Sequence, residues 1–128
     1  MTGKGPSSAR ILVAEDDPAL REALKDVLAL AGYAAVAVSN GTQALAAACA
    51  DPPDLIILDH LMPGMDGLSV LRALQADPRL RTIPVIFLSG AAHDLPPQPG
   101  VAAIIEKPFQ MVPLQETVRS LLASRPVP

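Results

Sequence analysis

The segment Leu55-Ile56-Ile57-Leu58-Asp59 consists of four large apolar residues followed directly by a carboxylate. Continuous apolarity over so short a run, without alternation, is typical of a strand covered on both faces, as in a parallel sheet. An aspartate placed where such a strand ends is costly to bury unless it has a partner. The segment therefore predicts a buried strand with a polar site at its carboxyl end.

Four further apolar runs of similar length predict the remaining strands, and helical patterns separate them. The strands are expected at residues 11–14, 34–38, 84–88 and 102–105. Asp17 followed by Pro18 predicts a helix start, because aspartate caps free N–H groups and proline suits the first helical position. Gly32 predicts the end of that helix, and Asn40 with Gln43 predicts the capping box of a second one. Alternating strands and helices indicate an α/β, doubly wound parallel sheet.

The connection between the fourth and fifth predicted strands departs from this pattern. Residues 90–100 should hold a crossover helix, but they include Pro96, Pro97 and Pro99. Proline inside a helix removes a hydrogen-bond donor and clashes with the preceding turn. We therefore predict a loop here, with the helix between strands 4 and 5 shortened or missing.

Composition restricts the classes of function. A chain of 128 residues, 50% hydrophobic and 18% charged, has the size and core of one domain. We expect a disordered lead-in at residues 1–9, a domain at 10–124 and a tail at 125–128. A net charge of -3 without a basic cluster argues against nucleic-acid binding. One cysteine excludes an internal disulfide and a cysteine-rich zinc site.

The same sequence argues against membranes and secretion. No apolar run approaches the roughly 18 residues that a membrane span requires. The residues before Arg10 contain no apolar core of a signal peptide. We therefore expect a cytoplasmic protein that does not bind membranes.

Polar side chains stand at the carboxyl ends of four predicted strands. These residues are Glu15 and Asp16, Asp59, Ser89, and Lys107. The carboxyl ends of parallel strands meet at one edge, where ligands of α/β sheets bind. Three carboxylates gathered there repel one another, and a hard divalent cation relieves that repulsion. An all-oxygen site favours Mg²⁺, or Mn²⁺, over zinc.

This set of residues predicts chemistry on a phosphoryl group. Asp59 would be the nucleophile that forms an aspartyl phosphate. Asp16 would bind the metal together with Asp59, with Glu15 bound directly or through water and the backbone carbonyl of Leu61 as a further ligand. Each residue alone also has an ordinary structural explanation, such as a turn-forming aspartate; their joint occurrence at strand ends favours the site.

The remaining two side chains would act on the phosphoryl oxygens. Lys107 would neutralise their charge together with the metal. Ser89 would donate a hydrogen bond to one of these oxygens once the group is attached.

The chain resembles a response-regulator receiver domain, the phosphoacceptor module of two-component signalling. The matching stretches are Ile11-Leu12-Val13-Ala14-Glu15-Asp16-Asp17, residues 55–67 from Leu55 to Gly67, Pro84-Val85-Ile86-Phe87-Leu88-Ser89-Gly90, and Lys107-Pro108-Phe109. The resemblance covers about residues 10–123. It implies a flavodoxin-like five-stranded sheet in the order 2-1-3-4-5, Mg²⁺ dependence, and a cis Lys107–Pro108 peptide.

The resemblance also implies partners. A histidine kinase or histidine phosphotransfer protein would donate the phosphoryl group, docking on the first helix at Leu20, Arg21 and Leu24 and on the loop after Lys107. Output would run through an unidentified downstream protein, from a stand-alone receiver. Two departures affect that output: Ile104 stands where the family often has an aromatic switch residue, and the crossover helix is broken by proline.

Three alternatives remain beside the phosphoacceptor. A receiver-like interaction module that works without phosphorylation would have the same fold and a similar partner face. An aspartyl-phosphate hydrolase needs a second acid two residues after the nucleophile, and that position is Leu61. A flavin-binding protein would have a phosphate loop free of acids, unlike Glu15-Asp16-Asp17. We therefore expect a protein that catalyses its own phosphorylation and dephosphorylation but is not a turnover enzyme.

Overall fold

A single parallel sheet with helices on both faces makes up the computed structural model, which describes residues 9–90 and 100–123. Along the chain the elements are β1 (Arg10–Ala14), α1 (Pro18–Leu30), β2 (Ala34–Val38), α2 (Gly41–Ala50), β3 (Leu55–Asp59), α3 (Gly67–Ala76), β4 (Val85–Ser89), β5 (Val101–Glu106) and α4 (Met111–Ala123). All four strand pairs are parallel, in the order β2-β1-β3-β4-β5. The predicted fold class and strand order are therefore confirmed.

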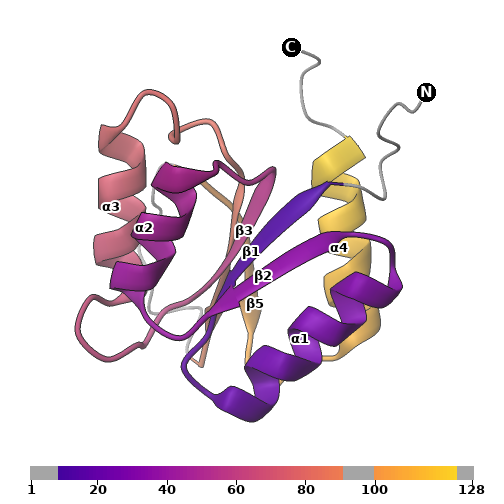
Figure 1. Cartoon of the computed structure of the whole chain (residues 1–128). Coiled ribbons are helices and arrows are strands. Elements are labelled where there is room, and N and C mark those ends of the chain that lie inside the picture. The colour runs from indigo at the N-terminus through magenta and orange to yellow at the C-terminus, as the bar shows by residue number, and fades with distance from the viewer. Residues whose placement is uncertain (1–8, 91–99, 124–128) are drawn as a thin grey trace.

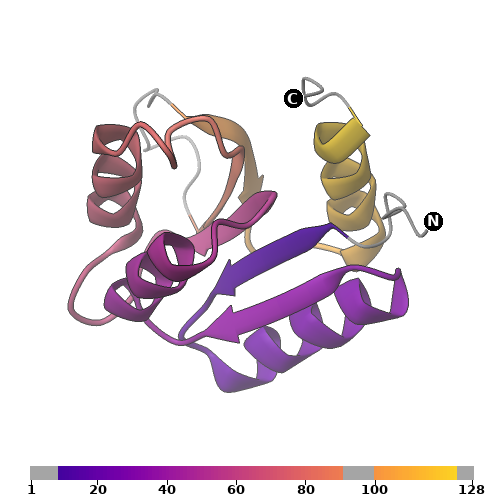
Figure 2. The same ribbon diagram turned by 45° about the horizontal axis from the view of Figure 1, so that its top comes forward.

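The core consists of two apolar layers, one on each face of the sheet. Figure 1 shows α2 and α3 on one side of the sheet and α1 and α4 on the other, and Figure 2 shows the same arrangement from above. Leu12, Ile56 and Phe87 belong to the layer under α2 and α3, whereas Ile57 and Ile86 belong to the other. Because successive residues of a strand point to opposite faces, the continuous apolar runs of β1, β3 and β4 supply both layers.

The two outer strands are less covered than the sequence pattern suggests. Every residue of β3 and β4 is buried, but alternate residues of β5 are exposed, and so are Ala34 and Val36 in β2. The prediction that all five runs are covered on both faces is therefore wrong for β2 and β5. An outer strand has a neighbouring strand on one side only, and α2 packs against β1 rather than over β2.

The helix boundaries follow the predicted capping chemistry. Asp17 accepts a hydrogen bond from the amide of Ala19 at 3.0 Å at the start of α1. Asn40 accepts one from the amide of Gln43 at 2.8 Å, and the Gln43 side chain accepts one from the amide of Ser39 at 3.0 Å. The bond from Gln43 to Asn40 is the expected N-cap, whereas the Gln43 side chain binds the amide one residue before the N-cap amide that a capping box uses.

Glycine occupies the two backbone positions with positive φ that border α1 and β5. Gly32 follows α1 with φ of 96°, as expected for a helix stop. Gly100 precedes β5 with φ of 88°, and a Cβ there would overlap the side chain of Gln75 in α3. The predicted loop between β4 and β5 lies mostly within residues 91–99, outside the described residues, so its conformation stays a prediction. None of the helices in the described ranges has the length and apolarity to cross a membrane.

Candidate functional site

The predicted site residues lie at the carboxyl edge of the sheet. Figure 2 shows the parallel strands ending on this edge. Glu15 and Asp16 follow β1, Asp59 is the last residue of β3, Ser89 is the last of β4, and Lys107 follows β5. The strand order brings these ends together although the residues are far apart in sequence. The site is therefore built by the topology of the sheet and by no single local motif.

Three carboxylates form a compact cluster of possible metal ligands. One oxygen from each of Glu15, Asp16 and Asp59 lies within 4.8 Å of the other two. Glu15 and Asp59 are buried, with 0% and 4% exposure, whereas Asp16 is exposed. The cluster therefore has two fixed inner acids and one outer acid that faces solvent.

Lys107 brings one positive charge to the two buried acids. Its Nζ lies 3.0 Å from Oε1 of Glu15 and 3.1 Å from Oδ1 of Asp59. The backbone amide of Lys107 donates to the carbonyl of Ser89 at 2.7 Å, which joins the ends of β5 and β4. The Lys107–Pro108 peptide is cis, as the resemblance implied. One ammonium is thus shared between two carboxylates, which leaves the cluster negative when all three acids are ionised.

Backbone contacts hold Glu15 and the turn after β1. The amide of Asp17 donates to Oε2 of Glu15 at 3.1 Å. The guanidinium of Arg21 donates to the carbonyl of Glu15 at 3.1 Å and to that of Asp16 at 3.4 Å. Residues at the start of α1 therefore fix the backbone of Glu15 and Asp16 and the side chain of Glu15.

Burial dominates the electrostatics of the two inner acids. Burial raises the pKa of Glu15 from 4.5 to about 7, and the charge of Asp59 adds to the rise, against hydrogen bonds from Asp17 and Lys107. Burial also raises the pKa of Asp59 above 3.8, against the lowering effect of Lys107. Burial lowers the pKa of Lys107, but its hydrogen bonds to both acids outweigh this and raise the pKa above 10.5. The raised pKa values of Glu15 and Asp59 show that Lys107 does not fully offset the cost of burying two carboxylates. The raised pKa of Lys107 shows that the two acids stabilise its charged form.

The donor set fits a hard divalent cation. The buried Oε1 of Glu15 has the ammonium of Lys107 at 3.0 Å, and Asp59 shares that ammonium. Two buried carboxylates with one counter-charge are costly, and a second cation beside them lowers that cost. Because all the donors are carboxylate oxygens, the site suits Mg²⁺ or Mn²⁺ rather than zinc.

Ser89 and Leu61 are placed differently around this cluster. Ser89 is 2% exposed, on the strand that pairs with β3, with Leu88 opposite Asp59 in the register. Leu61 lies two residues after Asp59, and its side chain is 70% exposed. Its backbone carbonyl stays a predicted metal ligand.

Gly67 has a close contact at the site that sequence reasoning missed. A Cβ at this position would lie 2.5 Å from the carbonyl oxygen of Asp59 and 3.0 Å from Cα of His60. The amide of Gly67 also donates to the carbonyl of His60 at 2.9 Å. The signal in the sequence was a glycine directly after the helix cap Asp66, but a cap position alone does not reveal which backbone it touches.

The expected docking residues on α1 require one correction. Leu24 is fully buried in the layer under α1 and α4, so its side chain cannot contact a phosphodonor. Leu20 and Arg21 are half-buried and stay predicted docking residues. Helical spacing placed Leu20 and Leu24 on one face, but that face is turned towards the core, more completely at Leu24.

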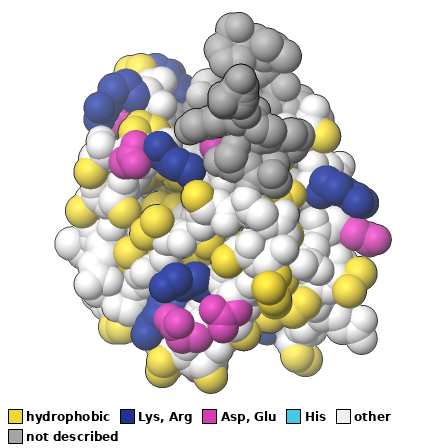
Figure 3. Space-filling model, turned by 45° about the vertical axis from the view of Figure 1, so that its right-hand side comes forward, with side chains coloured by type: hydrophobic (Ala, Val, Ile, Leu, Met, Phe, Trp, Pro, Cys, Tyr) yellow, Lys and Arg dark blue, Asp and Glu magenta, His cyan; other side chains and the backbone are white. Residues whose placement is uncertain are grey.

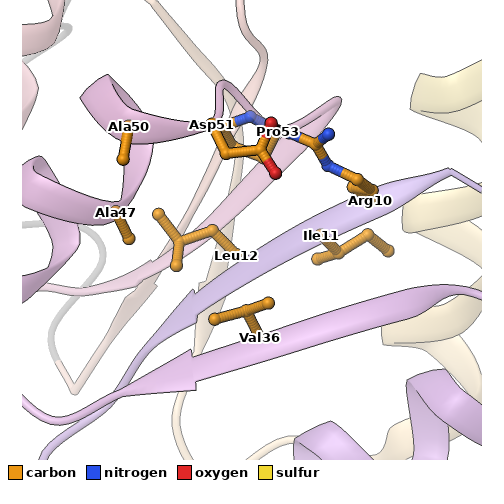
Figure 4. A pocket seen from close by; sticks show the side chains of 8 residues that line it. All are labelled: Arg10, Ile11, Leu12, Val36, Ala47, Ala50, Asp51 and Pro53. Atoms are coloured by element: carbon orange, nitrogen blue, oxygen red, sulfur yellow. Dashed lines mark ion pairs between the residues drawn. The ribbon is translucent and has the colours of Figure 1, made fainter.

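One side of the molecule (Figure 3) shows how charged side chains are distributed outside the site. On the side of the molecule in Figure 3, basic and acidic side chains occur in small mixed groups among hydrophobic ones, without a broad basic area. An apolar hollow of about 230 Å³ lies elsewhere, between α2 and the outer part of the sheet (Figure 4). Arg10 and Asp51 form an ion pair of 2.7 Å on its rim. Because Arg10 opens β1, this hollow is at the end of the strand opposite to Glu15 and is not part of the carboxylate site.

Comparison with known proteins places this geometry in a family. The model of the response regulator receiver domain family matches residues 11–119. The response regulator PleD of Caulobacter vibrioides (strain NA1000 / CB15N) is 41% identical over 118 residues, which are 89% of this chain and 26% of PleD. The DNA-binding response regulator MtrA of Mycolicibacterium smegmatis is 37% identical over 117 residues, which are 88% of this chain and 50% of MtrA. The chain thus spans between a quarter and a half of the length of these two relatives.

Solved structures agree with the sequence relatives. The signal receiver domain of a signal transduction histidine kinase from Syntrophus aciditrophicus has a TM-score of 0.81 and 37% identity, covering 94% of this chain and 96% of that one. The receiver domain of the sensor histidine kinase PA1611 from Pseudomonas aeruginosa PAO1 has a TM-score of 0.85 and 29% identity, covering 91% of this chain and 99% of that one. The PA1611 structure holds a magnesium ion coordinated in its active site cleft.

Proposed function

Because this chain belongs to the response-regulator receiver domain family, we propose that it accepts a phosphoryl group on Asp59 in a Mg²⁺-dependent reaction. The donor would be a phosphohistidine of a histidine kinase or histidine phosphotransfer protein. The observation that carries the proposal is the buried pair of Glu15 and Asp59, which shares Lys107 and stands beside Asp16. A carboxylate nucleophile, a counter-charge and a cation site are the parts that phosphoryl transfer requires.

The reaction moves one group between two nucleophiles. A carboxylate oxygen of Asp59 attacks phosphorus as the P–N bond to the donor imidazole breaks, and the electron pair of that bond returns to the imidazole nitrogen. Lys107, already 3.1 Å from Asp59, is near enough to balance charge on the phosphoryl oxygens. Bound at Glu15, Asp16 and Asp59, Mg²⁺ would supply the remaining positive charge. Ser89, buried at the end of the neighbouring strand, would donate a hydrogen bond to the attached phosphoryl group.

The same residues support acceptance of the group without catalytic turnover. A phosphatase of this type needs an acid to protonate its leaving group, and the position two residues after Asp59 is Leu61. We therefore propose a signalling protein whose phosphorylated form binds a downstream protein, and whose own reactions are limited to gaining and losing one phosphoryl group. PA1611, with its magnesium ion, supports the choice of metal by similarity.

Intact mass spectrometry tests the proposal. The wild-type protein is incubated with a small phosphodonor, with Mg²⁺ or with a chelator, beside an Asp59→Asn variant. We expect the wild type to gain one phosphoryl group only with Mg²⁺, and the variant to gain none. An unchanged wild-type mass, under conditions that label a known receiver domain, would contradict the proposal and favour an interaction module that works without phosphorylation.

A further inference from the structure

Arg21, near the start of α1, makes hydrogen bonds to three consecutive carbonyl oxygens. Its guanidinium Nη1 donates to the carbonyl of Glu15 at 3.1 Å and to that of Asp16 at 3.4 Å. Its backbone amide donates to the carbonyl of Asp17 at 2.8 Å. The β1–α1 turn (residues 15–17) therefore has its carbonyl groups bound by one residue of the helix that follows it.

One peptide group of this turn is held from both sides. The carbonyl of Asp16 and the amide of Asp17 belong to the same trans peptide, so they point in opposite directions. The guanidinium of Arg21 binds the carbonyl, and the carboxylate of Glu15 accepts from the amide at 3.1 Å. Arg21 is therefore coupled through a single peptide group to the buried acid that also contacts Lys107.

The two bonds of the guanidinium also fix the direction of the Asp16 side chain. Peptide groups are planar, so holding the carbonyls of Glu15 and Asp16 holds the planes on both sides of the Asp16 Cα. The φ and ψ angles of Asp16 follow from those planes, and with them the direction of its Cα–Cβ bond. Asp16 is exposed, so packing does not confine its side chain as it confines those of Glu15 and Asp59. The outer acid of the cluster therefore depends on its backbone for its position.

We propose that Arg21 is a positioning residue for the cation site, which sets the affinity for Mg²⁺ through the backbone of the β1–α1 turn. This inference rests on the proposed function, since it concerns the cation that the phosphorylation requires. The guanidinium binds two carbonyl oxygens and leaves the carboxylates of Glu15 and Asp16 to the cation. Without it, the turn samples other conformations, and the apparent affinity falls in proportion to the fraction that is competent to bind.

The direction of the change in affinity distinguishes this role from two others. Removing a positive charge near a cation site should tighten the binding of Mg²⁺ if only the Coulomb energy changes. A residue that only contacts a phosphodonor, as the family resemblance implied for Arg21, should leave the affinity unchanged. Loss of positioning should weaken the affinity, by about tenfold if the turn is competent about a tenth of the time.

NMR titration of the wild type and three variants with Mg²⁺ tests the proposal. Arg21→Met keeps the apolar stem of the side chain and removes the guanidinium, whereas Arg21→Lys keeps a positively charged donor. Lys25→Met removes the same charge from an exposed position one turn later in α1 and is the matched control. We expect Arg21→Met to weaken Mg²⁺ binding about tenfold, Arg21→Lys to recover most of the affinity, and Lys25→Met to bind as the wild type does.

Amide hydrogen exchange in the presence of a chelator gives a second measurement that does not depend on cation binding. The amide of Asp17 should exchange faster in Arg21→Met than in the wild type, whereas the amide of Gln43, which donates to Asn40, should not change. Equal or tighter Mg²⁺ binding by Arg21→Met, or an Asp17 amide that exchanges as in the wild type, would each overturn the proposal. A wild type that binds no Mg²⁺ would contradict the proposed function and with it the role in cation binding, even if faster exchange at Asp17 showed that Arg21 holds the turn.

Discussion

At Glu15, a fully buried carboxylate competes with Asp59 for one lysine, and this makes stability depend on pH. The pKa of Glu15 is about 7 in the folded chain against 4.5 ordinarily. Between these values the folded state binds more protons than the unfolded state, so stability falls as pH rises. The raised pKa of Asp59 acts in the same direction. Without metal, we expect Glu15 to remove on the order of 3 kcal/mol of unfolding free energy from pH 4.5 to above pH 7.

Denaturant unfolding at several pH values, in the presence of a chelator, measures this dependence. Glu15→Gln keeps the size of the side chain but cannot ionise, so its stability should vary much less over the same window. Glu22→Gln removes an exposed charge from α1 and serves as the control, with the slope of the wild type. Equal slopes in Glu15→Gln and the wild type would show that another group is responsible.

At the scale of elements, α3 begins against the backbone of Asp59 because Gly67 has no side chain. Ala in place of Gly gains up to about 1 kcal/mol of helix propensity. At Gly67, however, a Cβ meets the Asp59 carbonyl oxygen at 2.5 Å, and backbone cannot move aside cheaply. We expect Gly67→Ala to lose about 2 kcal/mol of stability, as in overpacked cores, and to slow phosphorylation by displacing Asp59.

Gly90→Ala is the control that distinguishes the close contact at Gly67 from the general effect of replacing glycine with alanine. Gly90 is exposed, and a Cβ there would meet nothing within 4 Å. Gly90→Ala should therefore change stability by no more than about 0.5 kcal/mol. Thermal melts and the rate of phosphorylation by a small phosphodonor measure both variants. If Gly67→Ala behaved like Gly90→Ala in both assays, the close contact would have no role in positioning Asp59.

The elements also show which features local sequence can predict. The starts of α1 and α2 were predictable because Asp17 and Asn40 act on amides two or three residues away. The contact of Gly67 with Asp59 was not, because it depends on the distance between α3 and β3. Leu24 shows the same limit: helical spacing marks a face, but only tertiary packing decides whether that face meets solvent or the core.

At the scale of the whole molecule, a bound cation should stabilise the fold by mass action. Mg²⁺ at ten times its dissociation constant would add about 1.4 kcal/mol, or roughly 5 °C in Tm for a domain of this size. Asp16→Asn removes one carboxylate of the cluster and should abolish most of the increase in Tm that Mg²⁺ causes. Asp26→Asn makes the same change of charge at an exposed position of α1, and its Tm should increase with Mg²⁺ as in the wild type. Differential scanning calorimetry with Mg²⁺ and with chelator distinguishes the two variants.

The proximity of Glu15, Asp16, Asp59 and Lys107 was predictable because parallel topology brings strand ends together. These residues and Ser89 could be grouped from their positions after apolar runs alone, and their roles stay predictions. Two features depend on the assembled sheet and could not be predicted. Lys107 contacts Glu15 as closely as Asp59, and β2 and β5 are half-exposed although their runs are as apolar as those of the central strands.

Lys107 reaches the site from just beyond β5, the outermost strand on one side, whereas Glu15 and Asp59 stand on inner strands. An outer strand with alternate residues in solvent opens locally at a lower free energy than strands buried on both faces. The ammonium of Lys107 is therefore carried just beyond a strand that opens more easily than the strands of the two buried acids. A protein whose binding displaced β5 would move Lys107 away from Glu15 and Asp59. The pKa of Asp59 would then rise further, because Lys107 lowers it.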